Sequence, residues 1–289
     1  MSIYTYMSLD MGQLDSVKAK LVAESGVLGL EVTIPEIVAY CNLGNLDHHG
    51  PTSTVNSPSA CEQAVTVELP PAGALLVTVY PDADSVTAMA VLANRASGDH
   101  VDLDLVQLVA NYDKYGPAMG RPADLLIAVS RIASNSKMAI AEKVEWIGCA
   151  LRGEVVEEQV ARFVKDHDRD FHEALEASTV TLRLGNKVAV VESTHRYATR
   201  IGYAHAEILV CVNPKFPVNF KDASDGTYVK YTICRFNQYV PFNLPKALVE
   251  LQELELGWGG RADIVGSPIG SSSKLSIEQV LSVVGKNLN

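Results

Sequence analysis

ALLVTVYPDADS, residues 74–85, is an apolar run that ends in two aspartates. The run is typical of a strand buried in a parallel sheet, and Asp84 is a candidate start for a helix running from Val86 to Asn94. If the turn between strand and helix is tight, Asp82 and Asp84 point into one crevice, where each could take a different metal ion. The alternative is that Asp84 caps the helix while Asp82 is solvated.

A second stretch, Leu46-Asp47-His48-His49-Gly50, places an acid and two histidines directly after a short apolar run. Carboxylates and imidazoles at the carboxyl ends of buried strands are the usual material of a divalent-metal site in an open α/β sheet. A histidine that binds a metal needs its other ring nitrogen held by an acceptor. Adjacent residues can then divide the roles, one as ligand and one facing a substrate. A solvated loop is the alternative.

Strand-like and helix-like segments alternate as far as about residue 120. The strand candidates are Ile3 to Leu9, Val27 to Val32 and Val77 to Tyr80. The helix candidates are Leu14 to Ala23, a short helix opened by a capping box at Ser59 and Glu62, Val86 to Asn94, and Leu103 to Tyr112. This alternation predicts an α/β fold in which helices cover both faces of a parallel sheet.

The texture of the sequence then changes twice. Residues 138–178 are helical in pattern and highly charged, and from residue 179 the chain is rich in strand-like segments. We therefore expect a catalytic domain over residues 1–135, a helical connector over residues 136–178, and a smaller α/β substrate-binding lobe over residues 179–289.

The composition limits the classes of function. The chain has 289 residues and a formal net charge of −10, which argues against binding long duplex nucleic acid on a basic face. A small phosphorylated substrate is still allowed, because bound metal ions can supply positive charge locally. No apolar run approaches the ~18 residues of a membrane span and the N-terminus lacks a secretory signal, so we expect a cytoplasmic protein without a membrane partner. The five dispersed cysteines indicate free thiols.

Two further aspartates complete the candidate metal ligands. Asp10 ends the first strand candidate and could bridge two ions, with Asp15 as a weaker competitor on a helix surface. Asp113 directly follows the helix candidate that ends at Tyr112. Together with the aspartates and histidines of the two motifs, these residues provide the oxygen and imidazole donors that suit Mn²⁺ or Mg²⁺.

The motifs resemble those of the DHH phosphoesterase family, which includes RecJ-type exonucleases, oligoribonucleases and manganese-dependent pyrophosphatases. Asp47-His48-His49-Gly50 is similar to the motif that names the family, and Tyr80-Pro81-Asp82-Ala83-Asp84-Ser85 to its DxD motif. Asp10 and Asp113 resemble its two isolated aspartates. Gly257-Trp258-Gly259-Gly260-Arg261 looks like the glycine-rich motif of the DHH-associated substrate-binding domain.

The resemblance implies a phosphohydrolase that holds two divalent ions in its N-terminal lobe while the C-terminal lobe closes over a small substrate. Asp82 and Asp84 would bind separate ions, Asp10 would bridge them, and His48 and Asp113 would complete one of the two sites. Such an enzyme would hydrolyse a short single-stranded oligonucleotide, a nucleotide or a similar phosphoester, and it could form a homodimer.

The remaining roles follow from the same resemblance. His49 would face the phosphate and Asp47 would support the histidines. The substrate would also meet Arg235 and the motif residues Gly259, Gly260 and Arg261. An arginine offers a planar fork that matches phosphate oxygens, whereas a salt bridge for Arg235 and a simple surface turn for the glycines are the alternatives.

Three departures from the family pattern stand out. The DxD motif follows the DHH motif instead of preceding it, as if the catalytic lobe were circularly permuted; parallel strands still converge at one sheet edge whatever their order. Thr78 stands where the family has a histidine, so one metal site is expected to be weak, occupied only with substrate, or completed from elsewhere, with His100 as a distant candidate. Arg261 replaces the family's common histidine.

Other charged residues are weaker candidates. His195, Arg196 and Arg200 could meet phosphate, and the run Asp166-His167-Asp168-Arg169-Asp170 is expected to be a solvated helix face. A nucleotide-binding or regulatory module with reduced catalysis is the main alternative function, favoured by Thr78. A dehydrogenase or transferase is less favoured, because no glycine-rich dinucleotide or Walker-type loop follows a strand candidate.

Overall fold

The computed structural model describes residues 3–9, 11–49, 57–116, 120–155, 157–219, 226–236, 240–260 and 263–288. It divides into two compact units, the first comprising Met1–Gly116 and Pro122–Asp166, the second comprising Pro117–Arg121 and His167–Asn289. The α/β fold predicted from the sequence is confirmed. The catalytic and substrate-binding roles of residues 1–135 and 179–289, with 136–178 as a connector, stay predictions.

The first unit is built on a parallel sheet. In the described part of the chain its strands lie in the order β1-β4-β2-β3, and every pairing between them is parallel. The strands are β1 (Thr5–Ser8), β2 (Val27–Leu30), β3 (Asn45–Leu46) and β4 (Leu75–Thr78). All residues of β2 and β4 are buried, as expected of strands covered on both faces.

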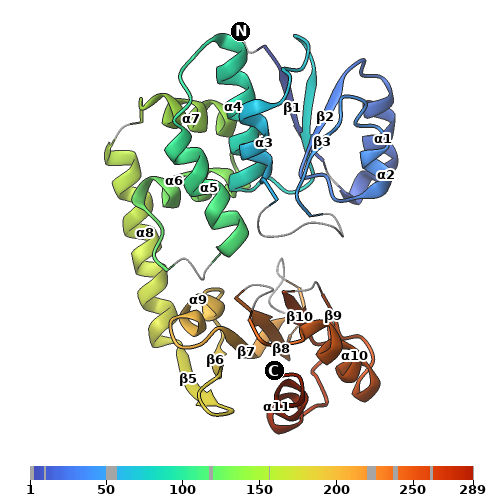
Figure 1. Cartoon of the computed structure of the whole chain (residues 1–289), viewed down its shortest axis with the longest axis vertical. Coiled ribbons are helices and arrows are strands. Elements are labelled where there is room, and N and C mark those ends of the chain that lie inside the picture. Colours follow the sequence, from blue (N-terminus) through green and yellow to red (C-terminus); the bar gives the residue numbers. More distant parts are fainter. Residues whose placement is uncertain are drawn as a thin grey trace. The chain divides into compact units, whose positions relative to one another are not determined.

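Helices cover both faces of this sheet (Figure 1). Alternate strand residues point to opposite faces, so Leu76 packs with one helix group while Val77 packs with the other. On the first face lie α3 (Ala60–Thr66), α4 (Ala83–Ser97), α5 (Leu103–Tyr115), α6 (Asp124–Ala133) and α7 (Ile140–Arg152); on the second lie α1 (Leu14–Val22) and α2 (Pro35–Val38), with the short turn η1 (Met11–Gln13) preceding α1.

Helix α4 is the central helix of this unit. Every residue from Asp84 to Leu92 is buried, as expected of a helix surrounded by the sheet and by other helices. Its N-cap is Asp82, whose side chain accepts a hydrogen bond from the backbone N–H of Ser85 at 2.9 Å. The expectation that Asp84 starts or caps the helix is therefore wrong by two residues: Asp84 already lies in the first turn.

The second unit is built on a mixed sheet. Among the residues that the structure describes, its strands lie in the order β5-β6-β7-β8-β10-β9, and only β6 and β7 pair in parallel. The strands are β5 (Ser178–Arg183), β6 (Val188–Ser193), β7 (Ile208–Pro217), β8 (Thr227–Arg235), β9 (Gly259–Gly260) and β10 (Ile264–Gly266). Helix α9 (Ala198–Tyr203) connects β6 to β7 and packs on one face. Helices α10 (Leu244–Leu254) and α11 (Ile277–Lys286) pack on the other.

Helix α8 (Glu157–Glu176) is shared between the units, which divide at Asp166 and His167. It carries the run Asp166–Asp170, and the expectation of a solvated face is wrong at His167, which is 5% exposed. No helix in the described ranges has both the length and the apolar character to cross a bilayer. All five cysteines are free.

Candidate metal centre

The carboxyl ends of the first sheet's strands are level with one another, because the register pairs Ser8 with Thr78 and Leu30 with Leu46. Acidic residues follow three of these ends: Glu31, Asp47 and Asp82. Ligands in open α/β sheets bind in the crevice outside the carboxyl ends of the strands. The acidic residues that follow these strands therefore lie at one edge of the sheet, although the DHH-like motif precedes the DxD-like motif in the chain.

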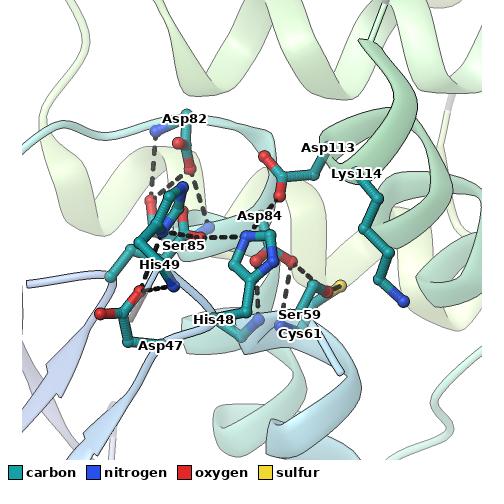
Figure 2. Close-up of polar contacts among 12 residues, drawn as sticks. Asp47, His48, His49, Ser59, Cys61, Asp82, Asp84, Ser85, Asp113 and Lys114 are labelled. Carbon is teal, nitrogen blue, oxygen red and sulfur yellow. Dashed lines mark hydrogen bonds and ion pairs between the residues drawn. The ribbon is translucent and has the colours of Figure 1, made fainter. Parts of the chain in front are cut away.

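His48 lies at the centre of the resulting cluster. Its Nε2 is 2.7 Å from Asp113 Oδ2 and 3.2 Å from Glu31 Oε1. Glu31, His48, Asp84 and Asp113 each place one potential ligand atom within 4.8 Å of the others. Four segments of the chain supply them: the end of β2, the segment after β3, the first turn of α4, and α5. Figure 2 shows His48, Asp84 and Asp113 side by side.

Several atoms of this cluster are buried without a hydrogen-bond partner among the described residues. They are Glu31 Oε1 and Oε2, His48 Nε2 and Asp113 Oδ2. His48 Nε2 lies close to both carboxylates, but a single ring N–H cannot donate a full hydrogen bond to two acids. A buried polar atom without a partner costs about 1–3 kcal/mol, more when it is charged. The cluster therefore leaves four buried polar atoms unsatisfied in the described part of the chain.

Burial and the closeness of the acids shift the pKa values of two residues in this cluster. Burial raises the pKa of Glu31, and the neighbouring charges of Asp82, Asp84 and Asp113 raise it further against the opposing effect of His48. Burial disfavours the charged form of His48, but the carboxylates of Asp113 and Glu31 outweigh it and raise its pKa well above the usual range. Acids held this close repel one another unless a proton or a cation intervenes.

Glu31 was missed in the sequence analysis. A signal for it exists, because it is a lone acid at the carboxyl end of the apolar run Val27–Leu30, by the same rule that selected Asp10 and Asp82. Its backbone has a φ of +54°, in the left-handed region that non-glycine residues seldom adopt. Its side chain is only 5% exposed. Strained backbone of this kind clusters at functional sites.

Strand β3 holds Glu31 in this conformation. The backbone N–H of Glu31 donates to Leu46 O at 2.9 Å. The side chain of Asn45 brackets the next residue, Val32, accepting from its N–H at 3.3 Å and donating to its carbonyl at 2.9 Å. Asn45 fits there because Gly29 has no side chain: a Cβ on Gly29 would lie 2.4 Å from Asn45 Oδ1.

Asp84 is fully buried and is also part of the scaffold. Its Oδ1 accepts from Ser59 Oγ at 2.9 Å and from Cys61 N at 3.0 Å, and its Oδ2 accepts from Ala60 N at 2.7 Å. These donors are at the N-terminus of α3, where unpaired backbone N–H groups favour a carboxylate. Glu62 closes the capping box predicted from the sequence by accepting from Ser59 N at 2.7 Å.

Asp82 has a different environment from Asp84. Its Oδ1 accepts from Ser85 N at 2.9 Å and Ser85 Oγ at 2.7 Å, and it is not one of the four clustered ligand residues. Its charge still reaches Glu31, whose pKa it raises. In Figure 2 the side chain of Asp82 lies beside Ser85, whereas that of Asp84 lies beside Ser59 and Cys61.

Asp47 supports His49. The Asp47 Oδ1 lies 2.9 Å from His49 Nδ1 and accepts from His49 N at 3.0 Å. Burial of Asp47 opposes its ionisation, but the bonds from His49 outweigh burial and lower the pKa of the carboxyl. With Nδ1 held in this way, Nε2 of His49 is left for a ligand or a substrate. The His49 side chain is 32% exposed, the His48 side chain 11%.

Residues predicted in the second lobe lie in the second unit. Arg235 ends β8, and its Nη1 donates to Phe242 O at 2.9 Å. Gly259 and Gly260 form the edge strand β9, where Gly260 has a φ of +151° and no room for a Cβ against Ile264 O. Asp10 and Arg261, both predicted to contribute, lie outside the described residues, as does Gly50 of the first motif.

His100, predicted as a distant candidate to complete a metal site beside Thr78, does not reach the cluster. Thr78 is fully buried in β4, and its Oγ1 has no hydrogen-bond partner among the described residues. His100 follows the C-terminus of α4, whereas Asp84 lies at its N-terminus. The 15 residues of α4 separate these ends by about 22 Å, so His100 cannot complete the cluster.

The donor set fits a divalent cation. Three carboxylates and one imidazole place potential ligand atoms within 4.8 Å of one another. Glu31, His48 and Asp113 each have at least one buried atom without a hydrogen-bond partner among the described residues. Oxygen donors with an imidazole suit Mn²⁺ and Mg²⁺, and carboxylates dominate such sites. These acidic and histidine groups could therefore hold a metal ion.

Known proteins give little guidance on this site. No family model matches the chain, and no curated protein matches it. Among solved structures, the chain is similar to a pGpG-specific phosphodiesterase, PggH from Vibrio cholerae, with 12% sequence identity and a TM-score of 0.42 over 73% of this chain and 76% of that chain. A likeness this slight carries no argument about function, so the case rests on the geometry.

Proposed function

We propose that the chain is a divalent-metal-dependent phosphoesterase that hydrolyses a small phosphorylated substrate, such as a short oligonucleotide or a nucleotide. The main support is the set of buried atoms of Glu31, His48 and Asp113 that lack hydrogen-bond partners in the described structure. A cation would satisfy all of them at once. The resemblance of residues 47–50 and 80–85 to DHH phosphoesterase motifs supports the same class of reaction.

The cofactor in this proposal is Mn²⁺ or Mg²⁺, held by Glu31, His48, Asp84 and Asp113. A second ion would draw on Asp82 together with Asp84. Divalent ions in such a pair supply positive charge against the phosphoryl oxygens and provide a nucleophile at neutral pH.

Side chains of the protein bind and position the substrate in this proposal. Asp47 fixes the ring of His49, so that Nε2 of His49 can meet a phosphoryl oxygen. Arg235, Gly259, Gly260 and Arg261 are proposed to bind the substrate, because a guanidinium matches phosphate oxygens and glycine lets the backbone approach closely. The net charge of −10 favours a small substrate over long duplex nucleic acid.

A nucleotide-binding module with reduced catalysis is the second candidate. Thr78 favours it, because a buried threonine stands at the position where the family has a metal-binding histidine. Calorimetry with nucleotides and Mn²⁺, run beside a turnover assay, separates the two. Tight binding without product supports the module, and product supports the hydrolase.

The turnover assay uses the full chain with Mn²⁺ and three phosphodiesters: bis-p-nitrophenyl phosphate, a linear dinucleotide and a cyclic dinucleotide. We expect His48→Ala and Asp113→Asn to lower the rate at least about 100-fold, since even indirect supports of metal ligands are worth 10–100-fold. Asp15→Asn, an exposed acid in the first turn of α1, is the matched control and should leave the rate unchanged. Undiminished activity in His48→Ala would remove the proposed site.

A further inference from the structure

The last turn of α5 carries Asp113, one of the four residues of the proposed metal centre. The last fully buried residue of this helix is Ala110, so the apolar core anchors the earlier turns of α5 more firmly than the last one. Tyr112 packs against the core from the last turn but is only half-buried. The position of Asp113 therefore depends on polar contacts as well.

Lys114, the residue after Asp113, makes such a contact. Its Nζ lies 2.5 Å from Oε2 of Glu62 in α3. The side chains of Lys114 and Glu62 are 9% and 20% exposed, so water and salt screen this ion pair less than one on the open surface. Figure 2 shows the side chains of Asp113 and Lys114 leaving α5 in different directions, as neighbours on a helix do. Lys114 can therefore hold the turn while Asp113 faces His48.

Glu62 joins α3 to two turns of α5. Besides its contact with Lys114, it accepts from Ser59 N at 2.7 Å, which closes the capping box of α3. Its Oε1 accepts from Gln107 Nε2 at 3.1 Å, and Gln107 lies about two turns before Lys114. Burial opposes the ionisation of Glu62, but the bonds from Lys114, Ser59 and Gln107 outweigh it and lower the pKa of this carboxyl. The ion pair is therefore charged at neutral pH.

Helix α3 is itself held to α4 at both of its ends. At the N-terminus of α3, donors of three successive residues bond Asp84. At the C-terminus, Nη1 of Arg95 in α4 donates to the carbonyls of Ala64 at 2.7 Å and Val67 at 2.9 Å. Helix α3 is thus a fixed support between the helix that carries Asp84 and the last turn of α5.

We propose that Glu62 and Lys114 are positioning residues of the metal centre: their ion pair ties the last turn of α5 to α3 and so sets the place of Asp113 relative to Asp84. Neither belongs to the four clustered ligand residues found in the described part of the chain. The inference rests on the proposed function, because both side chains act only through the ligands that they place. Residues that orient metal ligands are commonly worth about 10- to 100-fold in metal affinity.

The opposite charges of the pair separate positioning from simple electrostatics. Lys114 is a cation near the cluster, so its removal would by charge alone strengthen the binding of Mn²⁺. Removal of the negative charge of Glu62 would by the same reasoning weaken it. A positioning role predicts instead that the loss of either partner weakens Mn²⁺ binding. The two explanations therefore differ in sign at Lys114.

The test measures the Mn²⁺ affinity of the full chain by calorimetry in Lys114→Met, in Glu62→Gln and in the double variant. Glutamine still accepts the bond from Ser59 N, so the capping box survives. We expect each single variant to weaken Mn²⁺ binding about 10- to 100-fold. The double variant should lose no more than the larger single effect, because the two changes remove one shared interaction. Since it leaves no unpaired charge, it keeps the test open if a single variant does not fold.

Two further variants control for charge and for general destabilisation. Lys20→Met makes the same change in the last turn of α1, at an exposed residue, and should bind Mn²⁺ as the unmodified chain does. Lys114→Arg keeps the charge and should bind Mn²⁺ more nearly as the unmodified chain does than as Lys114→Met does. In the metal-free chain, backbone hydrogen exchange over residues 111–115 should quicken in Lys114→Met and stay unchanged in Lys20→Met. Circular dichroism shows whether each variant is folded.

Two results would overturn the inference. Tighter Mn²⁺ binding in Lys114→Met beside weaker binding in Glu62→Gln would reduce the pair to an effect of charge, and unchanged affinity in both would remove the pair from the metal centre altogether. Asp113→Asn, titrated in the same way, separates this failure from that of the proposed function. If Asp113→Asn alone loses Mn²⁺ affinity, only the positioning role is wrong; if it binds Mn²⁺ as the unmodified chain does, the metal centre is wrong and the inference fails with it.

Discussion

Acidic side chains are compensated differently in the two units. In the second unit, Asp168 accepts hydrogen bonds from Arg121 and lies beside His167. In the first unit, Glu31 and Asp113 share the single ring of His48, and several of their oxygens have no hydrogen-bond partner among the described residues. The acidic cluster of the first unit could hold a metal ion, and its unsatisfied buried atoms are the feature that sets it apart from Asp168.

The largest expected effect is on folding stability, at Asp84. It tests whether this residue stabilises the fold through its bonds to α3, apart from any role as a metal ligand. Asp84→Asn places an amide NH₂ against the N–H donors of α3, so we expect a loss of about 3 kcal/mol in the free energy of unfolding. Chemical denaturation followed by circular dichroism measures it. Asp15→Asn makes the same change in the first turn of α1 at an exposed residue and should cost less than about 0.5 kcal/mol. Equal effects in the two variants would contradict the scaffold role.

The second prediction concerns the effect of Mn²⁺ on folding stability. Mn²⁺ at a hundred times its Kd should raise the free energy of unfolding by about 2.7 kcal/mol, because it binds the folded chain alone. Glu31→Gln should lose most of this gain, and without metal it should be no less stable than the unmodified chain, since it removes one of the repelling acids. Thermal and chemical unfolding with and without Mn²⁺ measure both. A full metal-dependent gain in Glu31→Gln would exclude Glu31 as a ligand.

A third, smaller effect concerns Asn45, whose side chain holds the backbone next to Glu31. Asn45→Ala removes the two bonds to the backbone of Val32, so we expect a loss of about 1–2 kcal/mol in stability and a weaker Mn²⁺ affinity. Asn42→Ala is the matched control: Asn42 also bonds the backbone near β2, at Val27 N and Ser25 O, but away from Glu31. If Asn42→Ala weakens Mn²⁺ binding as much as Asn45→Ala, the two hydrogen bonds between Asn45 and Val32 have no special role in positioning Glu31.

The smallest effect is expected in the second unit. Asp168→Asn removes an ion pair whose two side chains are 50% and 42% exposed, so water can take its place and stability should change by less than about 1 kcal/mol. Mn²⁺ affinity should not change. Denaturation with a Mn²⁺ titration tests both. A loss as large as that of Asp84→Asn would show that the compensated charges of this unit are as costly to disturb as the acidic cluster.

The sequence predicted the α/β fold with its parallel sheet in the first unit. The apolar runs before Asp47 and Asp82 indicated strands. His48, Asp84 and Asp113 lie close enough together to share a metal ion, but their roles as ligands stay predictions. The α/β fold could be predicted because it depends on the alternation of strands and helices along the chain.

Other features depend on contacts that a sequence does not display. Asp82 and Asp84 are alike in the sequence, but the docking of α3 on Asp84 makes one a buried acceptor and the other a helix cap. The charged run on α8 resembles a solvated face, yet the packing of α9 buries His167. Glu31 was overlooked because a single acid between Leu30 and Val32 carries no motif. The roles assigned to Arg235, Gly259 and Gly260 stay predictions.

The central claim is that Glu31, His48, Asp84 and Asp113 surround a common cation. Diffraction from crystals soaked in Mn²⁺, collected on both sides of the manganese absorption edge, tests it most directly. The account predicts an anomalous peak within bonding distance of His48 Nε2 and of a carboxylate oxygen from Glu31 and from Asp113. A difference map without a peak among these side chains, at a Mn²⁺ concentration that saturates binding in solution, would contradict it.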